Sequence, residues 1–201
     1  MTNRWAASGL GLAALCALAQ LSPAAGSLLE LSRPALASGE CWRLLTGHLV
    51  HWSWAHLFWD ALPLVTLSGI IGARSPARLI ACLAGAALVV PLAVLLSAPQ
   101  ISTYRGLSGV DAGLYVLGGR LLVREHRRAG RRISLAAVRL ALAGFIAKVL
   151  YEAATGGGVF VDVQAVGVVT VPIAHVAGGA VGWLCGGQPG RASPDWRILS
   201  A

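Results

Sequence analysis

The sequence predicts an all-α membrane protein, built as a bundle of six membrane-spanning helices. Of its 201 residues, 56% are hydrophobic and only 12% are charged, whereas a soluble domain of this length would be about a quarter charged. The apolar residues gather in runs of about 20, the length that an α-helix needs to cross a bilayer. Most of the basic residues lie between these runs. Together these observations exclude an ordinary soluble fold.

The six expected helices are joined by short connections, so residues 1–201 are expected to form a single membrane domain. The helices are predicted at residues 5–21, 50–71, 79–96, 107–122, 133–151 and 163–184. The first could instead be a cleaved signal peptide. We expect a retained helix, because Arg4 is the only charge before it and Ser22–Ser27 is an indistinct cleavage site. A polar loop containing Glu30 and Arg33 is expected to follow.

The arginines predict the orientation of the bundle. They gather in the second and fourth connections and in the C-terminal tail, and the fourth connection, residues 123–132, is the most basic. The odd connections carry few cations and include Glu40 and Asp162. Because cytoplasmic loops are enriched in Arg and Lys, both termini are predicted to be cytoplasmic. The net charge of +8 is thus attributed to topology and to anionic lipid of the bilayer, not to nucleic acid.

Ionisable side chains within membrane spans are costly to bury and are therefore functional candidates. Ser108 is predicted near the outer start of the fourth helix, and His175 about halfway along the sixth. A hydroxyl needs a base to become a nucleophile near neutral pH, and an imidazole suits that role. The pair therefore indicates nucleophilic catalysis on the extracytoplasmic side.

Glycines explain how these two helices would meet. Gly109 and Gly113 in the fourth helix, and Gly178 and Gly182 in the sixth, have the G-x-x-x-G spacing that lets helix backbones approach closely. Such a contact is expected to bring Ser108 within hydrogen-bonding distance of His175.

The second helix supplies further polar groups. His56 and Asp60 are four residues apart and hence on one helix face, where they would help the Ser108 N–H to bind a developing oxyanion. His51 is a further candidate for the same cavity. Asp111 lies about 60° around the helix from Ser108 and is also expected to face it.

No metal and no cofactor are expected. His48, His51 and His56 are the residues that would bind a metal, but their H-x-x-H-x-x-x-x-H spacing is not a standard ligand frame. The four cysteines lie far apart with no C-x-x-C pair.

The pattern resembles the rhomboid family of intramembrane serine proteases. The resemblance rests on six helices, a His-rich second helix, G-L-S-G opening the fourth and A-H-V-A-G in the sixth. It implies Ser108 as nucleophile and His175 as base, in a dyad without an acid, and Gly106 as part of the substrate-binding motif. In the family motif H-x-x-x-N, His56 matches the histidine but Asp60 replaces the asparagine. Ala112 stands where many rhomboids have an aromatic residue against the histidine, so His175 must be held by another group.

Within that family the chain looks like a rhombosortase, on "CWRLLTGHLVHWSWAHL" and "GLSGV". This resemblance implies a substrate tethered by a C-terminal transmembrane helix and cleaved near a Gly-rich tail of the GlyGly-CTERM type. It also implies a bacterial inner-membrane location, with the active site facing the periplasm.

Two other functions remain open at this point. Asp60 and Ala112 would suit an inactive rhomboid-like protein that binds membrane clients. A small transporter would use Asp60, Asp111, Arg139 and His175 as a proton relay. Ser108→Ala separates them, because only a protease loses its function on that change.

Overall fold

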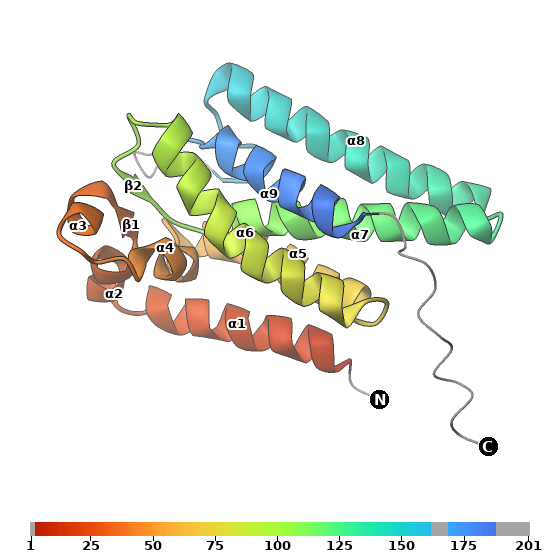
Figure 1. The fold of residues 1–201 in the computed structure, drawn as a ribbon, viewed down its shortest axis with the longest axis horizontal. Coiled ribbons are helices and arrows are strands. Elements are labelled where there is room, and N and C mark those ends of the chain that lie inside the picture. Colours follow the sequence, from red (N-terminus) through yellow and green to blue (C-terminus); the bar gives the residue numbers. More distant parts are fainter. Residues whose placement is uncertain (1–2, 162–168, 188–201) are drawn as a thin grey trace.

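The computed structural model describes residues 3–161 and 169–187, and within them six helices run alongside one another (Figure 1). They are α1 (Arg4–Gln20), α5 (Trp54–Gly72), α6 (Pro76–Ser97), α7 (Ser108–Arg128), α8 (Arg132–Thr155) and α9 (Pro172–Cys185). The prediction of an all-helical membrane protein is therefore confirmed in outline.

The count of six spans is not confirmed. Among the described residues, α5, α6 and α8 are long and apolar enough to cross a membrane. Helices α1 and α2 (Pro23–Leu29) together pass the same test, but they are bent by 111° at the break between them. Helix α9 has only 14 residues, and the last turns of α7 carry the Arg-rich stretch that was assigned to the fourth connection. Length and composition thus support three or four spans.

One predicted helix start was wrong, and another lies outside the described residues. The second helix begins at Trp54 instead of residue 50, because the Ser53 side chain accepts from the His56 N–H and caps it there. The sixth was predicted from residue 163. Residues 163–168 lie outside the described residues, and 169–171 are not helical. Pro172 occupies the first helical turn, where proline is favoured.

The segment predicted as a polar loop between the first two spans is an ordered structure. It contains α2, α3 (Arg33–Ala37), α4 (Arg43–Thr46), the 3-10 helix η1 (Gly47–Leu49) and strand β1 (Leu31–Ser32). Strand β1 pairs antiparallel with β2 (Thr103–Tyr104), with Leu31 opposite Tyr104. This pairing fastens the connection between α1 and α5, residues 21–53, to the chain just before α7.

Two arginines hold this connection between α1 and α5 in place. Arg33 donates to carbonyls at the C-terminal end of α6, including Leu95 O at 2.8 Å and Ala98 O at 3.0 Å. Arg43 is buried, pairs with Glu40 at 2.7 Å and donates to the Ser27 carbonyl at 2.7 Å. Since carbonyls at a helix end have no intrahelical partner, Arg33 acts as a side-chain cap for α6.

Helices α7 and α9 pack against each other through their glycines, as the spacing predicted. A Cβ added at Gly178 would collide with the Gly109 carbonyl, and one at Gly182 with the Gly113 carbonyl. Only glycine therefore permits this approach. The contact sets the distance between the helix that begins at Ser108 and the helix that carries His175.

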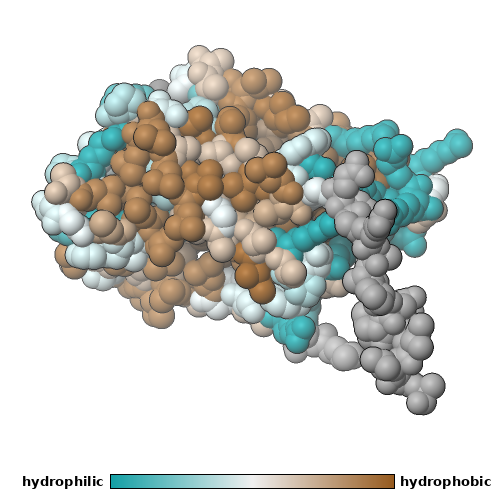
Figure 2. Space-filling model, viewed as in Figure 1, coloured by the Kyte–Doolittle hydropathy of each residue, from teal (hydrophilic) through white to brown (hydrophobic). Residues whose placement is uncertain are grey.

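The visible face of the molecule has an apolar middle between more hydrophilic ends (Figure 2). Figure 2 shows hydrophobic side chains over the middle of the visible face and hydrophilic ones toward the end where α7 meets α8. Arg74, Arg78 and Arg124 line a hollow there, and Arg74 pairs with Glu125 at 2.7 Å. Because Ser108 begins α7 and Arg124 lies near its end, the basic end and Ser108 are at opposite ends of the molecule.

Candidate active site

The chain enters α7 through a sharply turned loop that places Ser108 at the first residue of the helix. Gly106 has φ +112°, a conformation that favours glycine. Its N–H donates to the Gly47 carbonyl at 3.0 Å, and its own carbonyl lies 3.1 Å from His48 Nδ1. Helix η1, at the end of the connection between α1 and α5, thus bonds both the N–H and the carbonyl of Gly106.

His48 is a structural residue of this loop. Its Nε2 lies 3.0 Å from the Ala87 carbonyl of α6, so the ring joins the loop to that helix. Burial lowers the pKa of His48, although its two carbonyl partners act in the opposite direction. With both nitrogens facing carbonyls, His48 is not turned toward His51 or His56 as a ligand set would require.

Asp60 organises the other side of the loop. Its Oδ2 accepts from the Leu107 N–H at 2.9 Å and lies 3.2 Å from His51 Nε2 and 3.3 Å from His56 Nε2. The predicted shared face of His56 and Asp60 is thereby confirmed. The carboxylate is turned toward the backbone just before Ser108, so it acts here as an acceptor.

Gly106 also lies against these side chains. A Cβ at this position would come within 2.8 Å of His56 Cε1 and 3.2 Å of Asp60 Oδ2. A larger residue would have to push the imidazole away. Conformation and space thus both require glycine here.

His175 is positioned by α9 on one side and by α8 on the other. Its Nδ1 lies 3.3 Å from Glu152 Oε2, at ion-pair distance but outside hydrogen-bond geometry. The same carboxylate oxygen pairs with Lys148 Nζ at 2.8 Å. Lys148 and Glu152 are four residues apart, a spacing that by itself predicts only their own pairing, so the contact with the imidazole is a finding of the structure.

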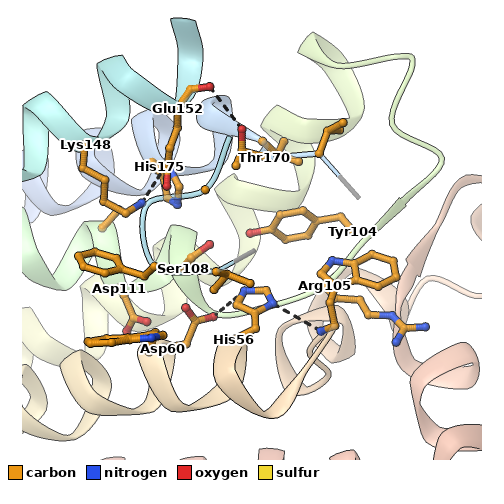
Figure 3. Close-up of a pocket in the computed structure, with 18 of the residues that line it drawn as sticks. His56, Asp60, Tyr104, Arg105, Ser108, Asp111, Lys148, Glu152, Thr170 and His175 are labelled. Atoms are coloured by element: carbon orange, nitrogen blue, oxygen red, sulfur yellow. Dashed lines mark hydrogen bonds and ion pairs between the residues drawn. The ribbon is translucent and has the colours of Figure 1, made fainter. Parts of the chain in front are cut away.

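Most of the predicted site residues line one cavity of about 520 Å³. Ser108, His175, His56, Asp60 and Asp111 face it from α5, α7 and α9 (Figure 3). His51 does not line it, since its side chain is fully buried behind Asp60. Gly106 supports the wall from behind His56.

The expected hydrogen bond between Ser108 and His175 is not among those that the described residues form, so that prediction was wrong. The two side chains share the cavity without a direct bond. Catalytic hydrogen bonds are often long in the absence of substrate and tighten only when it binds.

Two unpartnered polar groups also face the cavity. Within the described residues, the Tyr104 hydroxyl and both Asp111 carboxylate oxygens are buried without a hydrogen-bond partner. Figure 3 shows the Tyr104 hydroxyl pointing toward Ser108. Burial raises the pKa of Tyr104, so its hydroxyl remains a donor at neutral pH. The sequence pointed to Asp111 but not to Tyr104, which faces the cavity because of the β1–β2 pairing.

The part of the chain that the structure describes contains no group of three His, Cys, Asp or Glu side chains arranged to hold a metal ion. His51 and His56 lie against the Asp60 carboxylate instead, and His48 lies against backbone carbonyls. The arrangement can supply a hydroxyl, an imidazole and several hydrogen-bond donors to one cavity.

Comparison with known proteins identifies a family but no individual curated relative. No curated protein matches the chain. The family model described as Rhomboid domain matches residues 38–188, which include every helix from α4 to α9. The match covers both Ser108 and His175. The chain therefore belongs to the rhomboid family, whose members are intramembrane serine proteases that act on membrane proteins.

Proposed function

We propose that the chain is an intramembrane serine endopeptidase with Ser108 as nucleophile and His175 as general base. The observation that carries the proposal is the shared cavity, in which a serine at a helix start and a histidine on the neighbouring helix face each other across a glycine contact. The family match supports the reaction class.

The reaction would follow the order usual for serine proteases. Ser108 Oγ attacks the carbonyl carbon of the scissile peptide, and its proton passes to His175. The imidazolium then gives that proton to the leaving amine, and a covalent acyl-enzyme remains. Water, deprotonated by His175, releases the new carboxyl terminus and restores the serine.

The oxyanion would be bound at the start of α7. The first N–H groups of a helix have no intrahelical partner, so the Ser108 N–H is suited to a developing negative charge. The Tyr104 hydroxyl offers a second donor beside it. His56 as an oxyanion donor stays a prediction. Asp60 suits a supporting role better than the predicted donor role, because its Oδ2 already accepts from the Leu107 N–H.

A proton relay has less support. Arg139, one of its four predicted members, is exposed on α8 and does not line the cavity. The remaining members, Asp60, Asp111 and His175, lie at one end of the molecule, and a relay would have to reach the other end.

We also propose the orientation and the substrate class. The arginines at one end support a cytoplasmic location for that end, so the cavity would open on the periplasmic side of a bacterial inner membrane. The substrate would be a protein anchored by a C-terminal transmembrane helix and cut near its Gly-rich tail. This last point rests on the rhombosortase-like stretches of the sequence.

The test is cleavage in cells. The chain is co-expressed with a tagged secreted protein that bears a Gly-rich motif and a C-terminal helix, and shortening is followed on gels. Shortening should be lost in both Ser108→Ala and His175→Ala. A serine-directed fluorophosphonate should label the wild-type chain but not Ser108→Ala. Labelling without shortening would overturn the substrate class alone, whereas a wild-type chain that neither cleaves nor is labelled would favour the inactive client-binding protein.

A further inference from the structure

Helix α8 buries a single residue, and that residue is an acid placed against His175. Glu152 is 4% exposed, whereas every other residue of α8 is at least partly exposed. Burial of a carboxylate is costly without partners. A helix that otherwise presents apolar side chains outward therefore has a specific reason to place an acid at this point.

The Glu152 carboxylate is held from three directions. Oε2 lies 2.8 Å from Lys148 Nζ and 3.3 Å from His175 Nδ1, and Oε1 accepts from the Val159 N–H at 3.4 Å. Figure 3 shows the three side chains together, with the imidazole lying between Glu152 and Ser108. A merely local pair of Lys148 and Glu152 would not require contact with another helix.

We propose that Glu152 is a positioning residue for His175, so that the site works as a Ser108–His175–Glu152 arrangement; this inference rests on the proposed function. In the working site, a small rotation of the ring would let Nδ1 donate its N–H to the carboxylate 3.3 Å away, and Nε2 is then left to accept the proton of Ser108. The proton moves from Ser108 Oγ to Nε2 and later to the leaving amine, and Glu152 takes no proton. Its charge stabilises the imidazolium between these two transfers.

Ala112 gives an independent reason for such a group. This residue lines the cavity at the position where the family resemblance implies an aromatic partner for the histidine, and it offers only a methyl group. An imidazole without such a partner needs another constraint on its rotation. The Glu152 carboxylate, 3.3 Å from Nδ1, is the group placed to supply one.

Other ionisable groups face the same space. They are His56 and Asp60 from α5, Asp111 and Tyr115 from α7, Tyr104 from β2, Arg105 from the loop that follows β2, and Lys148 from α8. Of the described residues, only Glu152 lies at ion-pair distance from His175. Variants on α8 leave the α5, α7 and β2 groups unchanged, so a change in pH dependence would report on Glu152 and Lys148.

The experiment measures the rate of fluorophosphonate labelling of Ser108 in the full chain against pH. Glu152→Gln should slow labelling by about 10- to 100-fold. It should also move the midpoint of the profile to lower pH by about one unit, because the imidazolium loses its carboxylate. Glu152→Asp should restore part of the rate. Lys148→Met, which leaves the carboxylate in place, should move the midpoint in the opposite direction.

Glu125→Gln is the matched control, since it removes a paired carboxylate at the basic end of the molecule. Its profile should coincide with that of the wild type. A uniform loss of rate in Glu152→Gln with an unmoved midpoint would overturn the inference. If Glu152→Gln does not fold, an unmoved midpoint of the pH profile in Lys148→Met would overturn the inference instead. The proposed function fails separately, through the absence of any Ser108-dependent labelling in the wild type.

Discussion

Two of the helices that pack against α9, α7 and α8, hold it in opposite ways. Toward α7 the contact is made by backbone and glycine, with no room for a methyl group at Gly178 or Gly182. Toward α8 the site contact is a cluster of long charged side chains, Lys148 and Glu152, around His175. The contact with α7 sets the distance between two helix backbones, and the contact with α8 sets the orientation of the His175 ring.

This difference separates two requirements of catalysis. The α7 contact places His175 near Ser108, and such a close contact between two backbones has little freedom to adjust. The α8 contact is made by side-chain atoms that can follow small movements, on a helix whose other residues are partly or fully exposed. Changes at the α7 contact should therefore affect folding, whereas changes at the α8 contact should affect mainly the rate and its pH dependence.

The largest effect is expected at the α7 contact itself. Gly178→Ala should destabilise the protein by about 3 kcal/mol or more, because the added Cβ would collide with the Gly109 carbonyl and force the helices apart. Thermal unfolding in detergent micelles measures the change. Activity should fall with stability, since Ser108 and His175 would separate. An unfolding temperature equal to that of the wild type would show that the contact between α7 and α9 is not the rigid one.

A smaller loss of stability and a large loss of activity are expected at the loop before α7. Gly106→Ala must adopt a positive φ, at a cost of about 1–2 kcal/mol, and its Cβ would press on His56. Displacement of the loop should reduce the cleavage rate by about 100-fold. Gly39→Ala is the matched control, because Gly39 has φ +94° and nothing within 4 Å of an added Cβ. Equal activity losses in both variants would assign the effect to backbone strain alone.

Asp60 tests whether the entry to α7 needs an oxygen or a charge. Asp60→Ala removes the acceptor of the Leu107 N–H and should cost about 2 kcal/mol, because a buried donor is left unpaired. Asp60→Asn keeps an oxygen at that place and should be more stable and more active than Asp60→Ala. The measurements are the unfolding temperature and the rate of Ser108 labelling. Equal defects in the two variants would mean that the carboxylate charge is itself required.

The sequence predicted the α7 side of the comparison because its signals are local or periodic. The G-x-x-x-G spacing indicated a close helix pair without any knowledge of the loops between them. The i, i+4 spacing placed His56 and Asp60 on one face. The first residue of α7 was predicted to within one position, since the glycines around Ser108 interrupt the apolar run.

The α8 side was not predictable in the same way. Lys148 and Glu152 satisfy a local i, i+4 pattern, so nothing in the spacing required a third partner. Which face of α8 meets α9 depends on the connection between them and on packing against α7. In the connection between α1 and α5, Arg33 and Arg43 bind backbone carbonyls. Every residue has such a carbonyl, so these contacts leave no pattern in the sequence. The β1–β2 pairing joins two-residue strands, too short for an alternating pattern.

The smallest effect is expected on the exposed face of α8. Gly144 lies within this helix, and a Cβ added there would meet nothing within 4 Å. Gly144→Ala should change stability by no more than about 1 kcal/mol, in the stabilising direction, because alanine favours a helix over glycine. Thermal unfolding beside Gly178→Ala makes the comparison direct, since both variants add one methyl group to a helical glycine. A destabilisation of Gly144→Ala as large as that of Gly178→Ala would place a tight contact on α8 as well, and the contrast between the two sides of α9 would then be lost.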